Sequence, residues 1–313
     1  MLPLSADPTE PKIAILIPCL NEEQAIAEVV RAFQSELPAA EIVVMDNAST
    51  DRTAQVAASV GARVLFEARR GKGHALQSLF ERVEADVYVM VDGDNTYPAD
   101  KVKALLAPVL ANEADMSIGS RLLSASRRGF KAANWFGNIF FQNVINIVFG
   151  THLTDILSGY RAMNRKLVES LPLFSPGFEI EAEITIKSLQ RGFRLKEIPI
   201  ELRPRQAGSF SKIRLLRDGF RILGTIFALF RDYKPLTFFG GWGLFFMALG
   251  AIPGLRAIIG YWQTGLVLYF PSAILAVGLV LTGLLSIAVG LVLHTVNRRF
   301  REMEHFIRLS GRR

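Results

Sequence analysis

The segment Asp92-Gly93-Asp94 places two carboxylates two positions apart, directly after the apolar run 87–91. Carboxylates held this close together repel each other unless a cation neutralises them. Hard oxygen ligands of this kind select Mg²⁺ or Mn²⁺. The spacing therefore predicts a divalent-metal site formed by Asp92 and Asp94.

Polar side chains also follow two earlier apolar runs. Asn21 and Glu22 come after the run 12–18, and Asp46 closes the run 41–46. Carboxylates at three successive strand ends would face a crevice, and such a placement is unusual unless they have a function. These residues are therefore candidates for contact with a ligand.

Other polar residues near these positions have simpler explanations. Ser49 and Asp51 are best interpreted as turn or helix-cap residues. The stretch 69–73 (RRGKG) is basic, flanked by glycine and lies at the entrance of a predicted helix, which suits contact with an anion. A solvated basic turn has the same sequence, so this motif alone leaves both interpretations open.

The runs that carry these residues alternate with amphipathic segments. Predicted strands, short and rich in β-branched residues, span 12–18, 41–46, 63–67, 86–92 and 116–120. Predicted helices comprise one capped by Asn21 and others at 51–60, 73–83 and 100–111. This alternation predicts an α/β fold with a mainly parallel sheet covered on both faces. Such sheets bind ligands at the carboxyl ends of their strands, where the carboxylates lie.

Several classes of protein are excluded by what the sequence lacks. It contains no G-x-G-x-x-G after a strand, no G-x-x-x-x-G-K-[ST] and no G-x-S-x-G. Its four histidines are too scattered for a metal cluster. Its single cysteine, Cys19, excludes an intramolecular disulfide framework and a Cys-based zinc site, and it fits a reducing compartment.

The C-terminal third is too apolar for a soluble domain. Residues 236–255 and 266–293 form stretches of 20 and 28 residues without a charged side chain. Each is long enough to cross roughly 30 Å of hydrocarbon as a helix. The linker 256–265 contains Tyr261 and Trp262, which suit the membrane interface. Two membrane-spanning helices are therefore expected.

The net charge of +7 is concentrated beside these stretches, because residues 209–234 and 294–313 each carry a net charge of +4. This placement argues against a nucleic-acid-binding face and, by the positive-inside rule, puts both outer ends in the cytoplasm. The N-terminus lacks the pattern of a signal peptide. Amphipathic helices lying in the interface are expected at 132–150, in preference to a core helix, and at 211–231.

Together these patterns predict four parts of the chain. The predicted parts are a catalytic domain at 1–208, a basic amphipathic helix at 209–234, two membrane helices at 235–296 and a basic cytoplasmic tail at 297–313.

The motifs resemble, in order, those of glycosyltransferase family 2. They are P-x-x-N-E-E, D-N-A-S-T-D-x-T, R-G-K-G, D-G-D-x-T-Y-P, I-G-S-R, D-x-x-S-G-Y-R and R-x-x-G-S-x-S-K. Within that family the chain is most similar to the polyprenyl-phosphate glycosyltransferases, such as dolichol-phosphate mannose synthase. The resemblance runs from about residue 12 to residue 235 and implies a GT-A type fold. No single motif is decisive, but the ordered set is specific.

The resemblance also implies roles for individual residues. The catalytic residues would be Asp92, Asp94, Arg121 and Glu181, with Mg²⁺ or Mn²⁺ held by the two aspartates. The nucleotide-sugar would contact Pro18, Asn21, Glu22, Asp46, Lys72, Asp92 and Gly93. Phosphate and acceptor binding would fall to Arg121, Tyr160, Arg161, Arg205 and Lys212, with Arg203 beside Arg205. Some mannose synthases have a glutamine as a further metal ligand where this chain has Thr96.

The implied reaction is transfer of a sugar, with inversion, from a nucleotide-sugar to a polyprenyl phosphate. UDP-glucose or UDP-N-acetylglucosamine is the expected donor, and GDP-mannose is the alternative. A processive polysaccharide synthase ranks lower, because Q-x-x-R-W is absent. If the protein is not an enzyme, the alternative is a membrane scaffold without catalytic activity. The expected partners are the two substrates and the membrane, without nucleic acid, and a homo-oligomer is left open.

Overall fold

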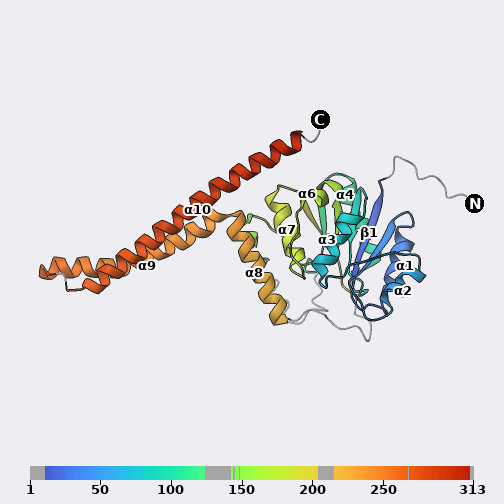
Figure 1. Ribbon diagram of the computed structural model, residues 1–313, viewed down its shortest axis with the longest axis horizontal. Coiled ribbons are helices and arrows are strands. Elements are labelled where there is room, and N and C mark those ends of the chain that lie inside the picture. The colour runs from blue at the N-terminus through green and yellow to red at the C-terminus, as the bar shows by residue number, and fades with distance from the viewer. Residues whose placement is uncertain are drawn as a thin grey trace, which may run out of the picture. The chain divides into compact units, whose positions relative to one another are not determined.

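The computed structural model describes residues 11–123, 142–143, 145–147, 149–203, 215–266 and 268–310. The chain divides into two compact units, Met1–Ile226 and Phe227–Arg313, which are considered separately (Figure 1). Most of the interfacial helix predicted at 132–150, and both Arg205 and Lys212, lie outside the described residues. The four-part division of the chain stays a prediction.

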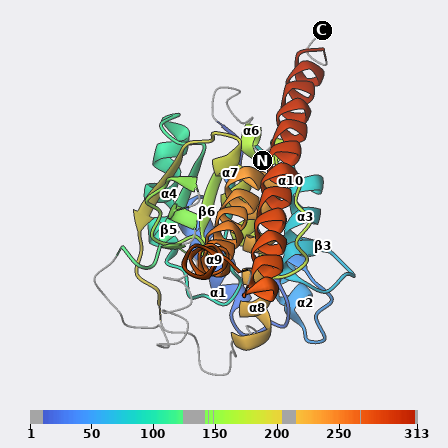
Figure 2. The same cartoon turned by 90° about the vertical axis from the view of Figure 1, so that its left-hand side faces the viewer.

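A seven-stranded sheet forms the centre of the first unit (Figure 2). Its strands are β1 (Ile13–Cys19), β2 (Glu41–Asp46), β3 (Arg63–Phe66), β4 (Val87–Met90), β5 (Met116–Ser120), β6 (Arg161–Asn164) and β7 (Leu195–Pro199). Their order is β3-β2-β1-β4-β6-β5-β7, and only β6 runs antiparallel to its neighbours. The five strands predicted up to residue 120 are confirmed, and so is the mainly parallel sheet.

Helices cover both faces of this sheet. They are α1 (Ile26–Glu36), α2 (Thr53–Ser59), α3 (Lys72–Arg82), η1 (Ala99–Lys101), α4 (Val102–Leu110), α6 (Arg165–Ser170) and α7 (Ile180–Gln190). Side chains of β1 alternate between two cores: Ile15 and Ile17 pack with α1 and α4, whereas Ala14 and Leu16 pack with α3 and α7. A strand buried on both faces must be apolar throughout, which explains the uninterrupted run in β1.

One prediction about the helices needs correction. Asn21 does not cap α1, which begins five residues later. Its φ of 53° places it in the left-handed region, and its side-chain oxygen accepts a hydrogen bond from the Thr50 amide instead. The strands β6 and β7 were not predicted from the sequence, because both are short and lack alternating apolar and polar residues.

The second unit is dominated by two long apolar helices, α9 (Pro235–Thr264) and α10 (Phe270–Ser310); α8 (Leu215–Tyr233) precedes them. Apolar stretches of 30 and 31 residues in α9 and α10 are long enough to cross a membrane. The predicted linker 256–265 is wrong, because α9 continues to Thr264 and the turn lies at 265–269. Gly265, with φ of 68°, ends the helix.

Glycines allow α9 and α10 to approach closely. A Cβ atom on Gly283 would lie 2.6 Å from the carbonyl oxygen of Gly243 and 2.5 Å from Cγ of Met247. Nearby, the Ser286 hydroxyl donates to the carbonyl oxygen of Phe239 at 2.8 Å. Small residues and interhelical hydrogen bonds are the forces that associate helices in lipid.

Replacing Gly283 by leucine should therefore separate the two helices. Overpacking of this kind costs about 1–3 kcal/mol, which should lower the Tm of the detergent-solubilised chain, followed by circular dichroism. Gly278→Leu is the matched control, since it lies in the same helix and a Cβ there meets nothing within 4 Å. Equal Tm values for the two variants would contradict the contact.

Candidate active site

The carboxyl ends of the parallel strands and the start of β6 bring the predicted site residues to one edge of the sheet. Asp92 and Asp94 follow β4, Arg121 follows β5, and Gly159 precedes β6, whose reversed direction starts it at this edge. Gly93 lies against the end of β1, since a Cβ atom there would be 2.5 Å from Sγ of Cys19. The fourth strand end is thus held directly against the first.

A buried lysine lies at the centre of the site. Lys72 Nζ is 2.5 Å from Asp92 Oδ1 and 2.5 Å from Glu181 Oε1, so three separate elements meet at one ammonium group. Only 10% of the Lys72 side chain is exposed. Burial opposes its charge, but the two carboxylates outweigh burial and raise the pKa of Lys72. Burial also raises the pKa of Glu181, against the effect of Lys72.

Two amides at the start of α3 are already hydrogen-bonded within the protein. The Gly73 amide donates to the carbonyl oxygen of Pro176 at 3.0 Å, and Gly71 has φ of 141°. A Cβ atom at Gly71 or Gly73 would collide with the backbone of residues 175–176. The Gly71 and Gly73 amides are therefore engaged within the protein, and the Lys72 side chain meets carboxylates.

Asn47 shapes the loop that delivers Lys72. Its amide group donates to the carbonyl oxygens of Glu67 at 3.2 Å and Arg69 at 2.7 Å, and its side-chain oxygen accepts from the Gly71 amide at 2.7 Å. Glu67 strengthens the loop by accepting from both Arg69 and Ser78. Asn47 was not singled out from the sequence, although its place directly after a strand ending in Asp46 was a usable signal.

Arg121 forms a two-point ion pair with Asp155. Its Nε and Nη2 atoms lie 2.6 and 2.8 Å from the carboxylate oxygens of Asp155, which is fully buried. Burial disfavours the charge, yet Asp155 more than compensates and raises the pKa of Arg121. Glu197 fixes this pair by accepting from the Asp155 amide at 2.7 Å. Glu197 was not singled out from the sequence.

Tyr160 and Arg161 do not face a ligand, which corrects their predicted role in phosphate binding. Both are fully buried. The Arg161 guanidinium donates to the carbonyl oxygens of Ser158 and Ile156 and to the hydroxyl of Thr185. The Tyr160 hydroxyl lies 3.3 Å from the carbonyl oxygen of Pro98. The Arg161 guanidinium therefore links the loop before β6 to α7 through hydrogen bonds.

The loops predicted to hold the nucleotide are tied to one another. Across the 18–22 and 46–53 loops, the Asn21 amide donates to the Ser49 hydroxyl and the Asn21 side-chain oxygen accepts from the Thr50 amide. The Glu22 amide donates to the Thr53 hydroxyl. Asp46 is buried and accepts from the Ser49 amide. Ser49 has a structural role, as predicted, because its amide and hydroxyl are both hydrogen-bonded within these loops. Pro18, Asn21 and Glu22 are partly or fully exposed beside this turn.

Asp51 likewise has the structural role predicted for it. Its carboxylate accepts from the amides of Thr53 and Glu23, which is the pattern of a turn before a helix.

The acidic pair suits a divalent cation that shares its ligands with a substrate. Asp94 is buried, and its Oδ1 accepts from the Thr96 hydroxyl at 2.6 Å. No group of three or more His, Cys, Asp or Glu residues gathers within metal-binding reach in the described part of the chain. Mg²⁺ is commonly bound by one or two carboxylates together with substrate phosphates. Asp92 and Asp94 fit that arrangement. Among the described residues, the buried Oε2 of Glu181 has no hydrogen-bond partner.

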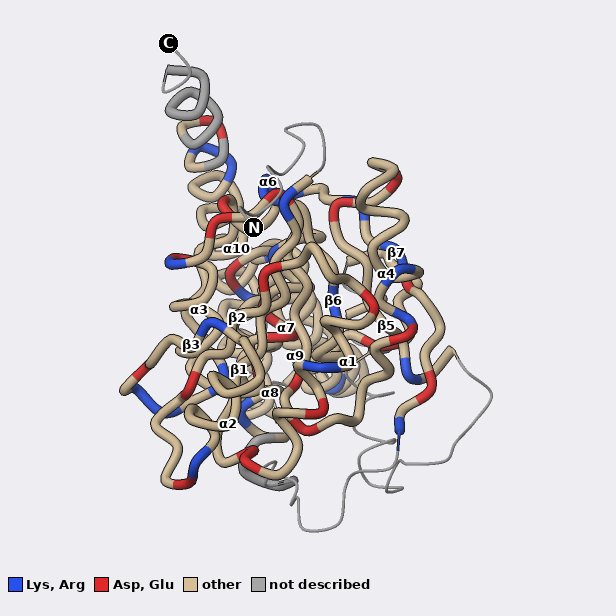
Figure 3. The backbone as a smooth tube through the Cα atoms, turned by 90° about the vertical axis from the view of Figure 1, so that its right-hand side faces the viewer, with Lys and Arg blue, Asp and Glu red and all other residues tan. Residues whose placement is uncertain are grey.

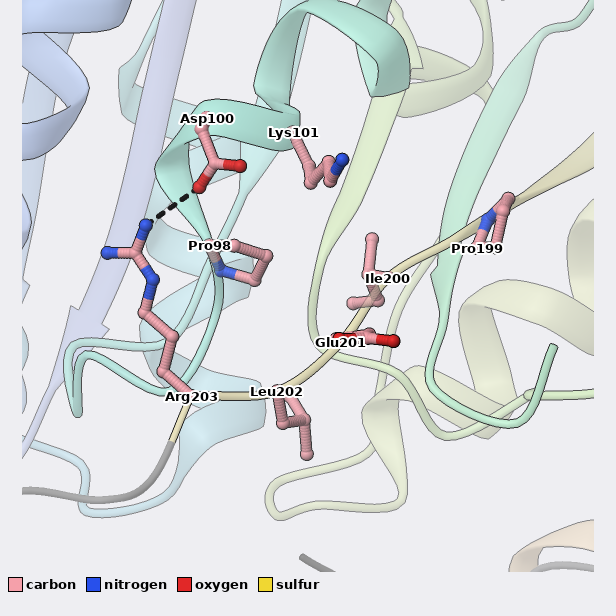
Figure 4. A pocket seen from close by; sticks show the side chains of 8 residues that line it. All are labelled: Pro98, Asp100, Lys101, Pro199, Ile200, Glu201, Leu202 and Arg203. Atoms are coloured by element: carbon pink, nitrogen blue, oxygen red, sulfur yellow. Dashed lines mark hydrogen bonds and ion pairs between the residues drawn. The ribbon is translucent and has the colours of Figure 1, made fainter. Parts of the chain in front are cut away.

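Arg203, expected beside the acceptor phosphate, pairs with Asp100 at 2.7 Å (Figure 4). The pair borders a cavity of about 530 Å³ between residues 98–101 and 199–203. The Arg203 amide donates to the carbonyl oxygen of Thr96 at 2.8 Å, so the chain leaving β7 is attached to the loop that carries the acidic pair. Figure 3 shows basic and acidic residues interspersed across this unit.

Comparison with known proteins identifies the class. The family model described as glycosyl transferase family 2 matches residues 14–171, and the chain belongs to this family. Glycosyltransferase AglJ of Haloferax volcanii is 32% identical over 255 residues, covering 81% of this chain and 83% of that protein. The dolichyl-phosphate hexose transferase of the same organism is 28% identical, covering 62% and 83%.

Solved structures agree on the fold. Glucosyl-3-phosphoglycerate synthase from Mycobacterium tuberculosis, in complex with Mn²⁺, UDP-glucose and phosphoglyceric acid, superposes with a TM-score of 0.59. The two chains are 23% identical over 70% of this chain and 80% of that one. The fold is therefore of the GT-A type, as expected, and the chain is a glycosyltransferase.

The Glu67 contacts make the loop before α3 sensitive to acid. Hydrogen bonds from Arg69 and then Ser78 lower the pKa of Glu67 from 4.5 to about 2. Its stabilising contribution should be complete above about pH 4.5 and decline as the pH falls toward 2.

The Tm difference between the wild type and Glu67→Gln, measured from pH 7 to pH 3, should therefore narrow as the pH falls. Glu113→Gln is the control, because its ion pair with Lys196 is exposed and contributes little. A Tm difference for Glu67→Gln that is constant across this range would show that its charge is not what holds the loop.

Proposed function

We propose that the chain transfers a sugar from a nucleotide-sugar to a polyprenyl phosphate, with inversion at the anomeric carbon. The observation that carries this proposal is the meeting of the Asp92 and Asp94 pair with Lys72, Glu181 and Arg121 at the carboxyl edge of the sheet. Relatives named for dolichyl-phosphate or polyprenol substrates, and two helices long enough to cross a membrane, support a lipid acceptor.

The acidic residues would bind the donor through a divalent cation. Asp92 and Asp94 would hold Mg²⁺ or Mn²⁺, which would supply charge stabilisation to the departing nucleoside diphosphate. Pro18, Asn21, Glu22, Asp46 and Gly93, which line the first, second and fourth strand ends, would contact the nucleotide.

The sugar would lie near the buried lysine. Lys72 can donate to a sugar hydroxyl or a phosphate oxygen, and Glu181 can accept from a hydroxyl, since its Oε2 has no partner among the described residues. Arg121, held in one orientation by Asp155, would bind a phosphate oxygen. Arg205 and Lys212 stay predicted contacts of the acceptor phosphate.

The acceptor needs little activation. A phosphate monoester is largely ionised at pH 7 because its second pKa is about 6. Its oxygen can attack the anomeric carbon without a strong general base, so positioning and charge stabilisation are the main tasks of the protein. The bond from the sugar to the nucleoside diphosphate breaks as the bond to the lipid phosphate forms, which inverts the configuration.

The donor sugar and the topology are finer points of the proposal. We favour UDP-glucose or UDP-N-acetylglucosamine, and a structural neighbour in complex with UDP-glucose and Mn²⁺ supports a UDP-sugar. GDP-mannose is the alternative, supported by a polyprenol monophosphomannose synthase of Mycolicibacterium smegmatis that is 27% identical over 66% of this chain. The helices α9 and α10 would span the bilayer with the catalytic unit in the cytoplasm.

The experiment is to incubate the detergent-solubilised full chain with Mn²⁺, undecaprenyl or dolichyl phosphate and each nucleotide-sugar in turn. Mass spectrometry should detect one sugar-phosphate lipid, whose sugar identifies the donor. No product from any donor would overturn the proposal.

The same assay tests the acidic pair. Asp94→Ala should lower product formation by about 100-fold or more, because a metal ligand is lost. Asp86→Asn is the control, since Asp86 lies exposed just before β4, at the opposite edge of the sheet. Full activity of Asp94→Ala would instead favour a pair without a catalytic role.

A further inference from the structure

Gly159 lies directly against the ion pair between Lys72 and Asp92. A Cβ atom built on Gly159 would be 2.9 Å from Asp92 Oδ2 and 2.9 Å from Lys72 Nζ. Real Cβ atoms essentially never approach other atoms this closely. Any side chain at position 159 would therefore occupy the space in which the carboxylate and the ammonium group meet.

The backbone conformation does not explain why this residue is glycine. Gly159 is not among the described residues with positive φ, so an L-residue could adopt its conformation without strain. The three atoms nearest to such a Cβ all belong to side chains of the candidate active site. What requires glycine here is the ion pair.

The loop around Gly159 has no freedom to move away. The Gly159 amide donates to the Tyr97 hydroxyl at 2.9 Å, and the Ser158 hydroxyl donates to the carbonyl oxygen of Gly119 at 2.6 Å. Arg161 donates to the carbonyl oxygen of Ser158 at 2.8 Å. All of these groups are buried, so breaking any of these bonds leaves a polar group unpaired at a cost of about 1–3 kcal/mol. A side chain at 159 would instead displace the ends of Lys72 and Asp92.

We propose that Gly159 is a positioning residue for Asp92. Its bare backbone, fixed by Tyr97 and Arg161, sets the orientation in which the Asp92 carboxylate meets Lys72. With Asp94, that carboxylate is then poised for the cation of the donor diphosphate. The metal role of Asp92 rests on the proposed function, whereas the contact between Gly159 and the ion pair does not.

The test compares Gly159→Ala with the wild type in the detergent-solubilised full chain. Mn²⁺ binding in the presence of UDP or GDP, followed by electron paramagnetic resonance, should weaken about 10–100-fold, the range for residues that orient metal ligands. Acylation of Lys72 by an amine-reactive reagent, measured by mass spectrometry, should become several-fold faster, since the methyl group displaces a side chain that is 10% exposed in the wild type.

Gly61→Ala is the control. Gly61 lies in the turn before β3, at the opposite edge of the sheet, and has φ of 86°, so alanine there should lower the Tm through backbone strain without moving either readout. If Gly159→Ala changes the Tm alone, as Gly61→Ala does, the proposal is overturned.

Two outcomes separate this inference from the proposed function. If the wild type makes no glycolipid, the proposed function fails, and the rate of Lys72 acylation still decides whether Gly159 positions the ion pair. If the wild type is active, excess Mn²⁺ should partly restore the activity of Gly159→Ala, which a general loss of structure would not allow. Unchanged Lys72 acylation would overturn the inference in either case.

Discussion

The candidate active site depends on one buried ammonium group. Asp92 and Glu181 come from a strand end and a helix nearly ninety residues apart in sequence, and both lie 2.5 Å from Lys72 Nζ. Removing a charge from water is costly unless an opposite charge meets it at close range. Lys72 lets two carboxylates share one buried region, and its own burial requires both of them. The three elements therefore have to be held together tightly.

Much of the surrounding structure meets that requirement. The start of α3 is joined to residues 175–176 through the Gly73 amide, and the Glu183 carboxylate accepts from the amides of the same segment. Glu183 is itself buried and paired with Lys187 at 2.6 Å. This pair fixes the segment against which Lys72 enters the site.

Local patterns predicted the first half of the catalytic unit well and the second half poorly. The strands β1, β2 and β4 are almost wholly apolar and buried, so their composition identifies them. The predicted phosphate-binding role of Arg161 was wrong, because a motif shows the arginine but not its burial. Only the tertiary fold gives Arg161 its two carbonyl acceptors and one hydroxyl acceptor. Gly159 was visible within its motif, yet its contact with Lys72 depends on residues far away in sequence.

The arrangement of charge gives a reason for metal and donor to bind together. Asp92 and Asp94 both follow β4 at this edge of the sheet. Their carboxylates carry the same sign of charge as a bare diphosphate and would repel it. Two aspartates offer a divalent cation too few ligands by themselves, while a diphosphate offers several oxygens. The cation would neutralise the negative charge of the diphosphate, and the diphosphate would supply the missing ligands of the cation. A site built this way therefore favours the metal–diphosphate complex over either component alone.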